Sequence, residues 1–146
     1  MADGQMKDVT TDELFSGKRV LMFGVPGAFT PACSDTHLPG YQARATDLLD
    51  AGVDAIACVA VNDAFVMDAW ARARGVGDEI LMLADGSGDF TRAMGLELDL
   101  GAVGMGRRSL RYAALIDDGK LEMLAVEPGR GVTVSSAESV LERLRS

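Results

Sequence analysis

Short apolar runs alternate with segments of mixed polarity along most of this chain. Two of these runs, at 20–25 and 55–61, lack polar alternation, which predicts β-strands that are buried on both faces, and a third strand is predicted at 80–83. The segments between them are predicted helices, at 30–49 with an interruption at Pro39-Gly40 and at 64–74, where Asn62 or Asp63 provides the cap. A strand–helix–strand order requires right-handed crossovers, so the core of the sheet is expected to be parallel.

The second half of the chain changes to an antiparallel pattern. Predicted strands at 110–116 and 120–126 flank the turn Asp117-Asp118-Gly119, which is typical of a hairpin. The glycine-rich stretch 101–106 follows no clear strand and is predicted to be a loop. Capping-box spacings predict a short helix after Thr10 and a C-terminal helix beginning at Ser135. These elements together predict a mixed sheet between two helix layers, the layout of a thioredoxin-like α/β fold.

Length and charge narrow the class of protein. The chain has 146 residues, 48% of them apolar and 25% charged, so we expect one globular domain over residues 1–146. A net charge of −8 disfavours binding to nucleic acid or to anionic membranes. The longest uncharged stretch, 20–34, is too short to span a membrane and contains Pro26 and Pro31. The polar N-terminus does not resemble a signal peptide, so a cytoplasmic location is expected.

Cys33 lies in the most informative segment of the chain. Thr30 stands where a helix N-cap belongs and Pro31 at the first helical position, so Cys33 falls in the first turn. The free amide groups and the dipole at a helix N-terminus stabilise a thiolate. The preceding strand places this turn at the carboxyl edge of the sheet, where α/β proteins usually bind ligands. From these features alone, a reactive thiol and an inert buried cysteine remain equally open.

The residues around Cys33 resemble the active-site segment of peroxiredoxins. The stretch FGVPGAFTPACSDTHLPGY (23–41) contains the GAFTP and HLPG elements of the type-five class, which reduces hydroperoxides with a cysteine. Similarity continues through VNDAFVMDAW (61–70), MLADGSGDFTRAMGLELDL (82–100) and RSLRYA (108–113). The resemblance covers the chain from about Val9 to its C-terminus, in the family's order and spacing.

The resemblance assigns roles to individual residues. It makes Cys33 the peroxidatic cysteine, Thr30 the active-site threonine and Arg111 the active-site arginine. Pro26 is then the proline that shields the site, and the peroxide is expected to bind among Pro26, Gly27, Thr30 and Arg111. The resemblance also implies a homodimer that uses glutathione or glutaredoxin as its reductant, and it implies no metal, flavin or haem cofactor.

The chain departs from the family pattern at two places, and the second concerns the mechanism. Members of the family often begin with an extra strand pair, whereas only about eight residues precede the matching region here. Many animal members carry a resolving cysteine where this chain has Val134. Cys58, the only other thiol, lies in an apolar strand, which favours simple packing over a resolving role. We therefore expect a one-cysteine mechanism in which an external thiol resolves the oxidised Cys33.

Other interpretations of the same residues stay open at this point. A redox sensor that signals through oxidised Cys33 needs the same reactive thiol, and a monothiol transferase acting on glutathione mixed disulfides is a third possibility. His37 either makes a structural hydrogen bond or assists proton transfer. Val103 and Met105 either line an apolar mouth for organic peroxides or simply pack, and Arg107 and Arg108 either are solvated or attract an anionic thiol.

Overall fold

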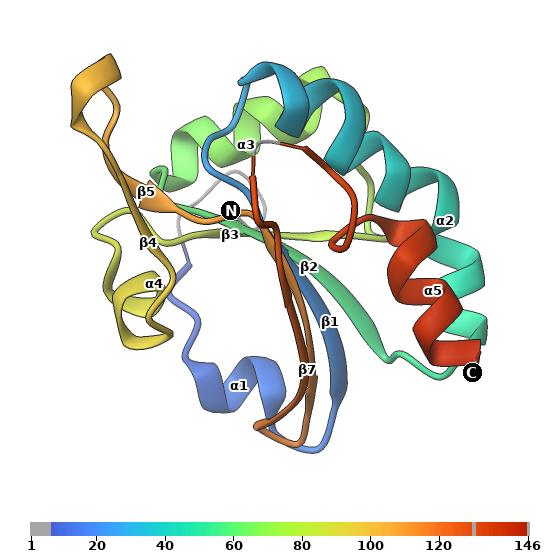
Figure 1. The fold of residues 1–146 in the computed structure, drawn as a ribbon. Coiled ribbons are helices and arrows are strands. Elements are labelled where there is room, and N and C mark those ends of the chain that lie inside the picture. Colours follow the sequence, from blue (N-terminus) through green and yellow to red (C-terminus); the bar gives the residue numbers. More distant parts are fainter. Residues whose placement is uncertain (1–6, 130, 146) are drawn as a thin grey trace.

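The computed structural model describes residues 7–129 and 131–145, and a five-stranded mixed sheet forms its centre (Figure 1). The strand order is β3-β2-β1-β6-β7. Neighbouring strands β1, β2 and β3 are parallel, whereas β6 is antiparallel to β1, and β7 to β6. The strands are β1 (Arg19–Gly24), β2 (Ala55–Ala60), β3 (Leu81–Ala84), β6 (Tyr112–Asp117) and β7 (Lys120–Val126).

Helices cover both faces of this sheet, as the sequence predicts for a thioredoxin-like fold. The longer helices α2, α3 and α5 lie on one side, and the short helices α1 and α4 lie on the other (Figure 1). Their bounds are α1 (Thr11–Phe15), α2 (Leu38–Asp50), α3 (Ala64–Ala73), α4 (Asp89–Ala93) and α5 (Ala137–Arg145). Within the described residues, no helix is both long and apolar enough to cross a membrane.

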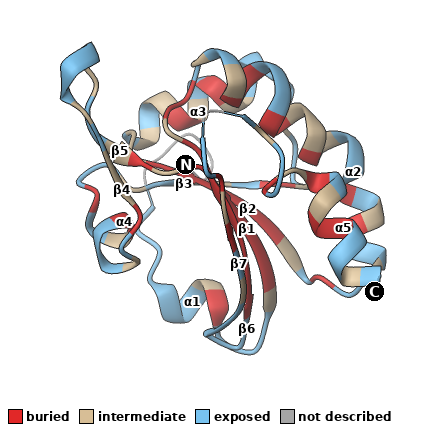
Figure 2. Ribbon diagram, in the orientation of Figure 1, coloured by how far each residue is buried: buried red, intermediate tan, exposed pale blue. Residues whose placement is uncertain are grey.

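Alternate residues of the central strand supply two separate apolar layers. Leu21 and Phe23 of β1 face a layer shared with α2, α3 and α5, whereas Val20 and Met22 face a layer that includes Phe15 of α1. Burial is therefore concentrated in the central strands and on the inner helix faces (Figure 2). This two-sided burial explains why the strand sequences lack polar alternation.

The predicted caps are only partly correct. Thr10 caps α1, since its hydroxyl accepts a hydrogen bond from the Glu13 amide at 3.2 Å. At the C-terminal helix, however, Ser136 is the cap, one residue later than predicted, and accepts from the Ser139 amide at 3.1 Å. Ser135 is thereby left free for another partner.

A hairpin that the sequence analysis missed projects from the body of the molecule. Strands β4 (Glu97–Leu100) and β5 (Gly106–Ser109) pair in antiparallel fashion, and the short 3₁₀ helix η2 (Gly101–Val103) lies at the tip. The predicted loop 101–106 is thus the end of a hairpin and does follow a strand. The alternation of acidic and leucine residues over 97–100 was a usable signal for β4, whereas the polar β5 carried none.

The pairing of β1 with β6 brings the two halves of the site together. Because these strands are antiparallel, the end of β1 at Gly24 lies opposite the start of β6 at Tyr112. Only glycine fits there, since a Cβ on Gly24 would lie 2.1 Å from a ring carbon of Tyr112. The loop that leads from β1 to Cys33 therefore leaves the sheet next to Arg111.

Candidate active site

Cys33 begins a π-helical turn, η1 (Cys33–His37), that continues directly into α2. The sequence predicts an ordinary first helical turn here, followed by an interruption at Pro39. Because Pro39 has no N–H and its ring crowds the preceding turn, the wider turn relieves the misfit before the proline. The Leu38 amide accordingly donates to the carbonyl of Cys33, five residues back. Cys33 is fully buried.

Arg111, which directly precedes β6, contacts the sulfur of Cys33. Its Nη2 donates to Cys33 Sγ at 3.2 Å, although 78 residues separate the two in the chain. The Arg111 side chain is 7% exposed, so little water competes for the guanidinium. A guanidinium is always charged at working pH and donates from a planar fork, which suits a thiolate and a second polar ligand together.

His37 holds the other arm of that guanidinium. Arg111 Nη1 donates to His37 Nδ1 at 3.0 Å, and His37 Nε2 lies 3.0 Å from the Ser135 carbonyl oxygen. Arginine can only donate and a carbonyl can only accept, so the proton of the neutral ring sits on Nε2. Burial, aided by the charge of Arg111, lowers the pKa of His37 to about 4. The structure thus shows a structural hydrogen bond, one of the two roles that the sequence left open for His37.

The loop before Cys33 is fixed at several points. Phe29 adopts a left-handed backbone with φ of 64°, which turns the chain just before Thr30. The Ala28 amide donates to the Asn62 side chain at 2.9 Å, which ties the loop to the end of β2. The sequence predicts Asn62 only as one of two possible caps for α3, and in the structure Asp63 is the cap.

Thr30 occupies the predicted N-cap position but does not cap with its side chain. Its backbone carbonyl accepts from the Ser34 amide at 2.9 Å, whereas its hydroxyl donates to the Gly27 carbonyl at 2.6 Å. The proton of the hydroxyl is thereby committed, and the oxygen lone pairs remain for a ligand. Gly27 is buried beside it, and the preceding Pro26 is half-buried.

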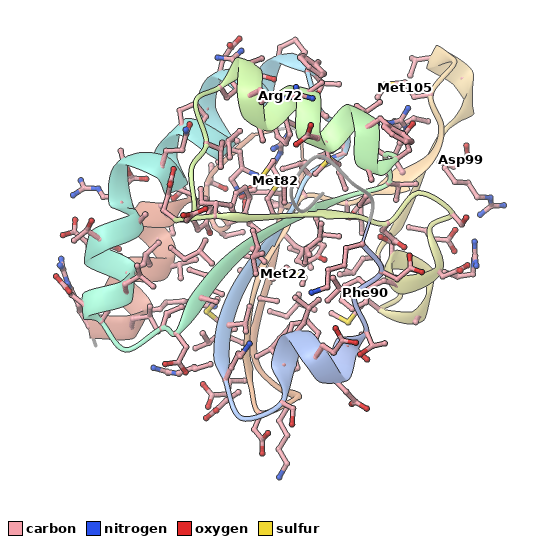
Figure 3. All side chains as sticks on the ribbon, turned by 180° about the vertical axis from the view of Figure 1, so that it is seen from behind. Met22, Arg72, Met82, Phe90, Asp99 and Met105 are labelled. Atoms are coloured by element: carbon pink, nitrogen blue, oxygen red, sulfur yellow. The ribbon has the colours of Figure 1, made fainter. Side chains whose placement is uncertain are left out.

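The projecting β4–β5 hairpin reaches the same loop. A Cβ on Gly27 would lie 3.4 Å from the Met105 methyl group and 3.2 Å from Arg108 Nη1. Met105 therefore borders the loop that carries Thr30, whereas Val103 is 68% exposed. Figure 3 shows Met105 near the end of the hairpin, well away from Met22 in the middle of the molecule. Of the two residues proposed to line an apolar mouth, only Met105 is placed to do so.

Cys58 lies within β2 and is fully buried. Burial, and secondarily the nearby Cys33, raises the pKa of the Cys58 thiol well above its ordinary value. A thiol that stays protonated in an apolar strand is a poor nucleophile. Its environment therefore matches the packing role that the sequence indicates.

Three residues that border the site were missed as functional. Tyr41 donates from its hydroxyl to the Ser135 carbonyl at 2.8 Å, and its ring stacks on Phe23 with centroids 4.0 Å apart. Ser135 itself donates to the side chain of Glu127. The HLPGY motif already contained Tyr41, and the family pattern linked Val134 to Cys33 as the place of a resolving cysteine, but no sequence signal pointed to Glu127 or Ser135.

Comparison with known proteins places the chain in a family. The Redoxin family model matches residues 1–141. Chloroplastic Peroxiredoxin-2E of Arabidopsis thaliana is 50% identical over 143 residues, which cover 97% of this chain and 61% of that protein. Peroxiredoxin-2C of the same plant is 46% identical over 140 residues, covering 96% of this chain and 86% of the relative. The chain thus spans less than two thirds of the length of the chloroplastic relative.

A solved structure agrees in sequence and in fold. Reduced Prx3 of Vibrio vulnificus in complex with H₂O₂ is 55% identical and superposes with a TM-score of 0.86, covering 90% of this chain and 84% of that one. The elements that position Cys33 and Arg111 are those of a thioredoxin-like sheet, and the sequence similarity extends through all of them. The chain therefore belongs to the Redoxin family and, within it, to the peroxiredoxins.

Proposed function

We propose that this chain is a thiol peroxidase that reduces hydrogen peroxide and small alkyl hydroperoxides through Cys33. The observation that carries the proposal is the 3.2 Å contact between Cys33 Sγ and the buried guanidinium of Arg111. The similarity to a Vibrio vulnificus protein solved in complex with H₂O₂ supports the same substrate class. The type-five class is part of the proposal and rests on the motifs around Cys33.

In the first step of the proposed cycle, Cys33 reacts while it is in contact with Arg111. The thiolate sulfur of Cys33 attacks one peroxide oxygen, the O–O bond breaks, and its electron pair leaves with the other oxygen. That oxygen takes up a proton and departs as water or an alcohol, and Cys33 becomes a sulfenic acid. Arg111 is placed to stabilise the charge on both sulfur and oxygen, because its donors are fixed before the reaction. Thr30 would accept a hydrogen bond from the peroxide O–H group, because its own hydroxyl proton is committed to the Gly27 carbonyl.

The second step requires a thiol from outside the chain. We propose glutathione, with or without glutaredoxin, which attacks the sulfenic sulfur and releases water to leave a mixed disulfide. A further thiol then exchanges with that disulfide and restores Cys33. Burial of Cys58 supports this one-cysteine cycle. A homodimer and a cytoplasmic location belong to the same proposal and rest on the resemblance and on the N-terminal sequence.

A steady-state assay tests the proposal. The purified chain is given peroxide with glutathione alone, with glutathione and glutaredoxin, or with a thioredoxin system, and the Cys33→Ser variant is the control. Many turnovers with either glutathione system support the proposal, and turnover only with thioredoxin overturns the choice of reductant. A single turnover in all three systems indicates a redox sensor, and activity on a glutathione mixed disulfide without peroxidase activity indicates a transferase.

A further inference from the structure

We propose that Glu127, which lies outside the reacting groups, positions Arg111 through a buried chain of hydrogen bonds. The inference rests on the proposed peroxidase function, in which Arg111 contacts the reacting sulfur. Among the described residues, the side-chain hydrogen bonds of Glu127 go to Thr133 and Ser135 and not to that sulfur or to the loop at 26–30. It is therefore a positioning residue, and it acts on Arg111 through Ser135 and His37, which lie between them.

A β-bulge brings Glu127 opposite Arg111. The hairpin register begins with Asp117 paired to Lys120, and a shift between Leu115 and Ile116 adds one residue to β7. Tyr112 consequently pairs with Val126, and the Glu127 amide donates to the Arg111 carbonyl at 2.9 Å. Without the extra residue, Val126 would oppose Arg111 and the side chain at 127 would point to the other face of the sheet.

The carboxylate of Glu127 anchors the segment that follows. It accepts from the Ser135 amide at 2.8 Å and from the Ser135 hydroxyl at 2.6 Å. It also accepts from the Thr133 amide at 2.8 Å and from the Thr133 hydroxyl at 2.7 Å. Four donors on one carboxylate that is 7% exposed fix the backbone at 133–135.

The anchored carbonyl of Ser135 then determines which ring nitrogen of His37 carries the proton. This oxygen accepts from Tyr41 at 2.8 Å and lies 3.0 Å from His37 Nε2. Because it takes the only ring proton on Nε2, it leaves Nδ1 as the acceptor that Arg111 needs. If the carbonyl moved, the ring could place its proton on Nδ1, which would face the guanidinium and displace it from Cys33.

The ionised state of Glu127 suits this role. Burial by itself would raise the pKa of Glu127, but the hydrogen bonds from Ser135 and Thr133 outweigh burial and lower the pKa to about 2. The charged groups that act on His37 are Arg111, at the start of β6, and Glu127, at the end of β7. Tyr41 of α2 shares the Ser135 carbonyl with His37, and Cys33 of the π-helical turn shares the Arg111 guanidinium with it.

Two substitutions separate hydrogen bonding from mere packing. Glu127→Ala removes all four acceptor contacts, and we expect kcat/KM for hydrogen peroxide to fall about 10- to 100-fold, as when a supporting residue behind a catalytic group is lost. Glu127→Gln keeps a carbonyl acceptor in the same place, and its rate should lie within about threefold of the parent, because Thr133 can turn its hydroxyl to accept from the amide. Glu13→Ala, an exposed glutamate on α1, is the matched control.

The single histidine of the chain provides a readout that does not depend on peroxidase activity. In ¹⁵N-histidine-labelled protein at pH 7, the parent, Glu127→Gln and Glu13→Ala should show one neutral ring with its proton on Nε2. Glu127→Ala should show a mixture with the Nδ1–H form or exchange-broadened ring signals. Circular dichroism establishes that each variant is folded.

The outcomes are distinct. A parental ring signal in folded Glu127→Ala overturns the proposal, and so does a Glu127→Gln variant as impaired as Glu127→Ala. If Glu127→Ala does not fold, the double variant Thr133→Val/Ser135→Ala takes its place, since it removes both hydroxyl donors and keeps the carboxylate. A parental rate and ring signal in that folded variant would also overturn the proposal. If no variant or parent has peroxidase activity, the proposed function fails while the ring signals still report on Glu127.

Discussion

Arg111 shows why charge alone is insufficient at this site. One guanidinium contacts both the sulfur of Cys33, at 3.2 Å, and Nδ1 of His37, at 3.0 Å. A planar fork can serve two partners in fixed directions, whereas an ammonium group is a point charge on a flexible stem. The family resemblance identified this arginine from its motif, but its second partner emerges only from the folded chain.

We predict that Arg111→Lys folds normally and loses about 100- to 1,000-fold in kcat/KM for hydrogen peroxide, the usual loss when one fixed donor to a developing charge is removed. Peroxide consumption under saturating reductant gives the rate, and the thermal midpoint checks the fold. Arg107→Lys is the control, because Arg107 is exposed and pairs with Glu97 on the same hairpin. A rate within about threefold of the parent would show that the positive charge at this position is sufficient and that the planar fork of Arg111 is not required.

At the scale of elements, local patterns predicted the framework and long-range contacts decided the site. The buried strands, the 117–119 hairpin and the first capping box follow from periodicity and turn chemistry. Pro39 predicted an irregularity in the helix, but the position of the π-helical turn depends on packing against the sheet. The His37–Ser135 contact joins residues 98 positions apart in the chain, so no local pattern could indicate it.

The joined elements also make a prediction about pH. The pKa of His37 falls from 6.5 to about 4 on folding, so the unfolded chain binds a proton in this window and the folded chain does not. The free energy of unfolding therefore contains the full contribution of neutral His37 above pH 6.5. This contribution decreases by about 3 kcal/mol as the pH falls from 6.5 towards 4. The contribution of Glu127 is lost in a lower window, between 4.5 and about 2.

His37→Gln isolates this effect, because glutamine offers a carbonyl to Arg111 and an amide to Ser135 but does not titrate. Urea unfolding at several pH values between 4 and 7 should give a shallower loss of stability for the variant than for the parent. The difference between the two curves removes the titration of the many surface carboxylates. Parallel curves would show that His37 is not protonated selectively in the unfolded chain.

At the scale of the whole molecule, the two cysteines belong to the same apolar layer but differ in surroundings. Cys33 and Cys58 both lie in the core beneath α2 and α3. Among the described residues, a charged donor contacts Cys33 but not Cys58, and burial raises the pKa of the Cys58 thiol well above its ordinary value. The fold thus places one thiol against a guanidinium at the sheet edge and the other inside an apolar strand. An internal disulfide would require α-carbons within about 7 Å and side chains that point together.

This contrast predicts how the oxidised enzyme is recycled. After one equivalent of peroxide without reductant, mass spectrometry should show one added oxygen on Cys33, and added glutathione should convert it to a mixed disulfide. Cys58→Ser should turn over at the parental rate, because the proposed cycle does not use Cys58. A loss of two hydrogens, with a linked Cys33–Cys58 peptide pair, would instead assign the resolving role to Cys58. Loss of steady-state turnover in folded Cys58→Ser would lead to the same assignment. The first turn of the Cys33 helix would then have to unwind in each cycle to bring the two sulfurs together.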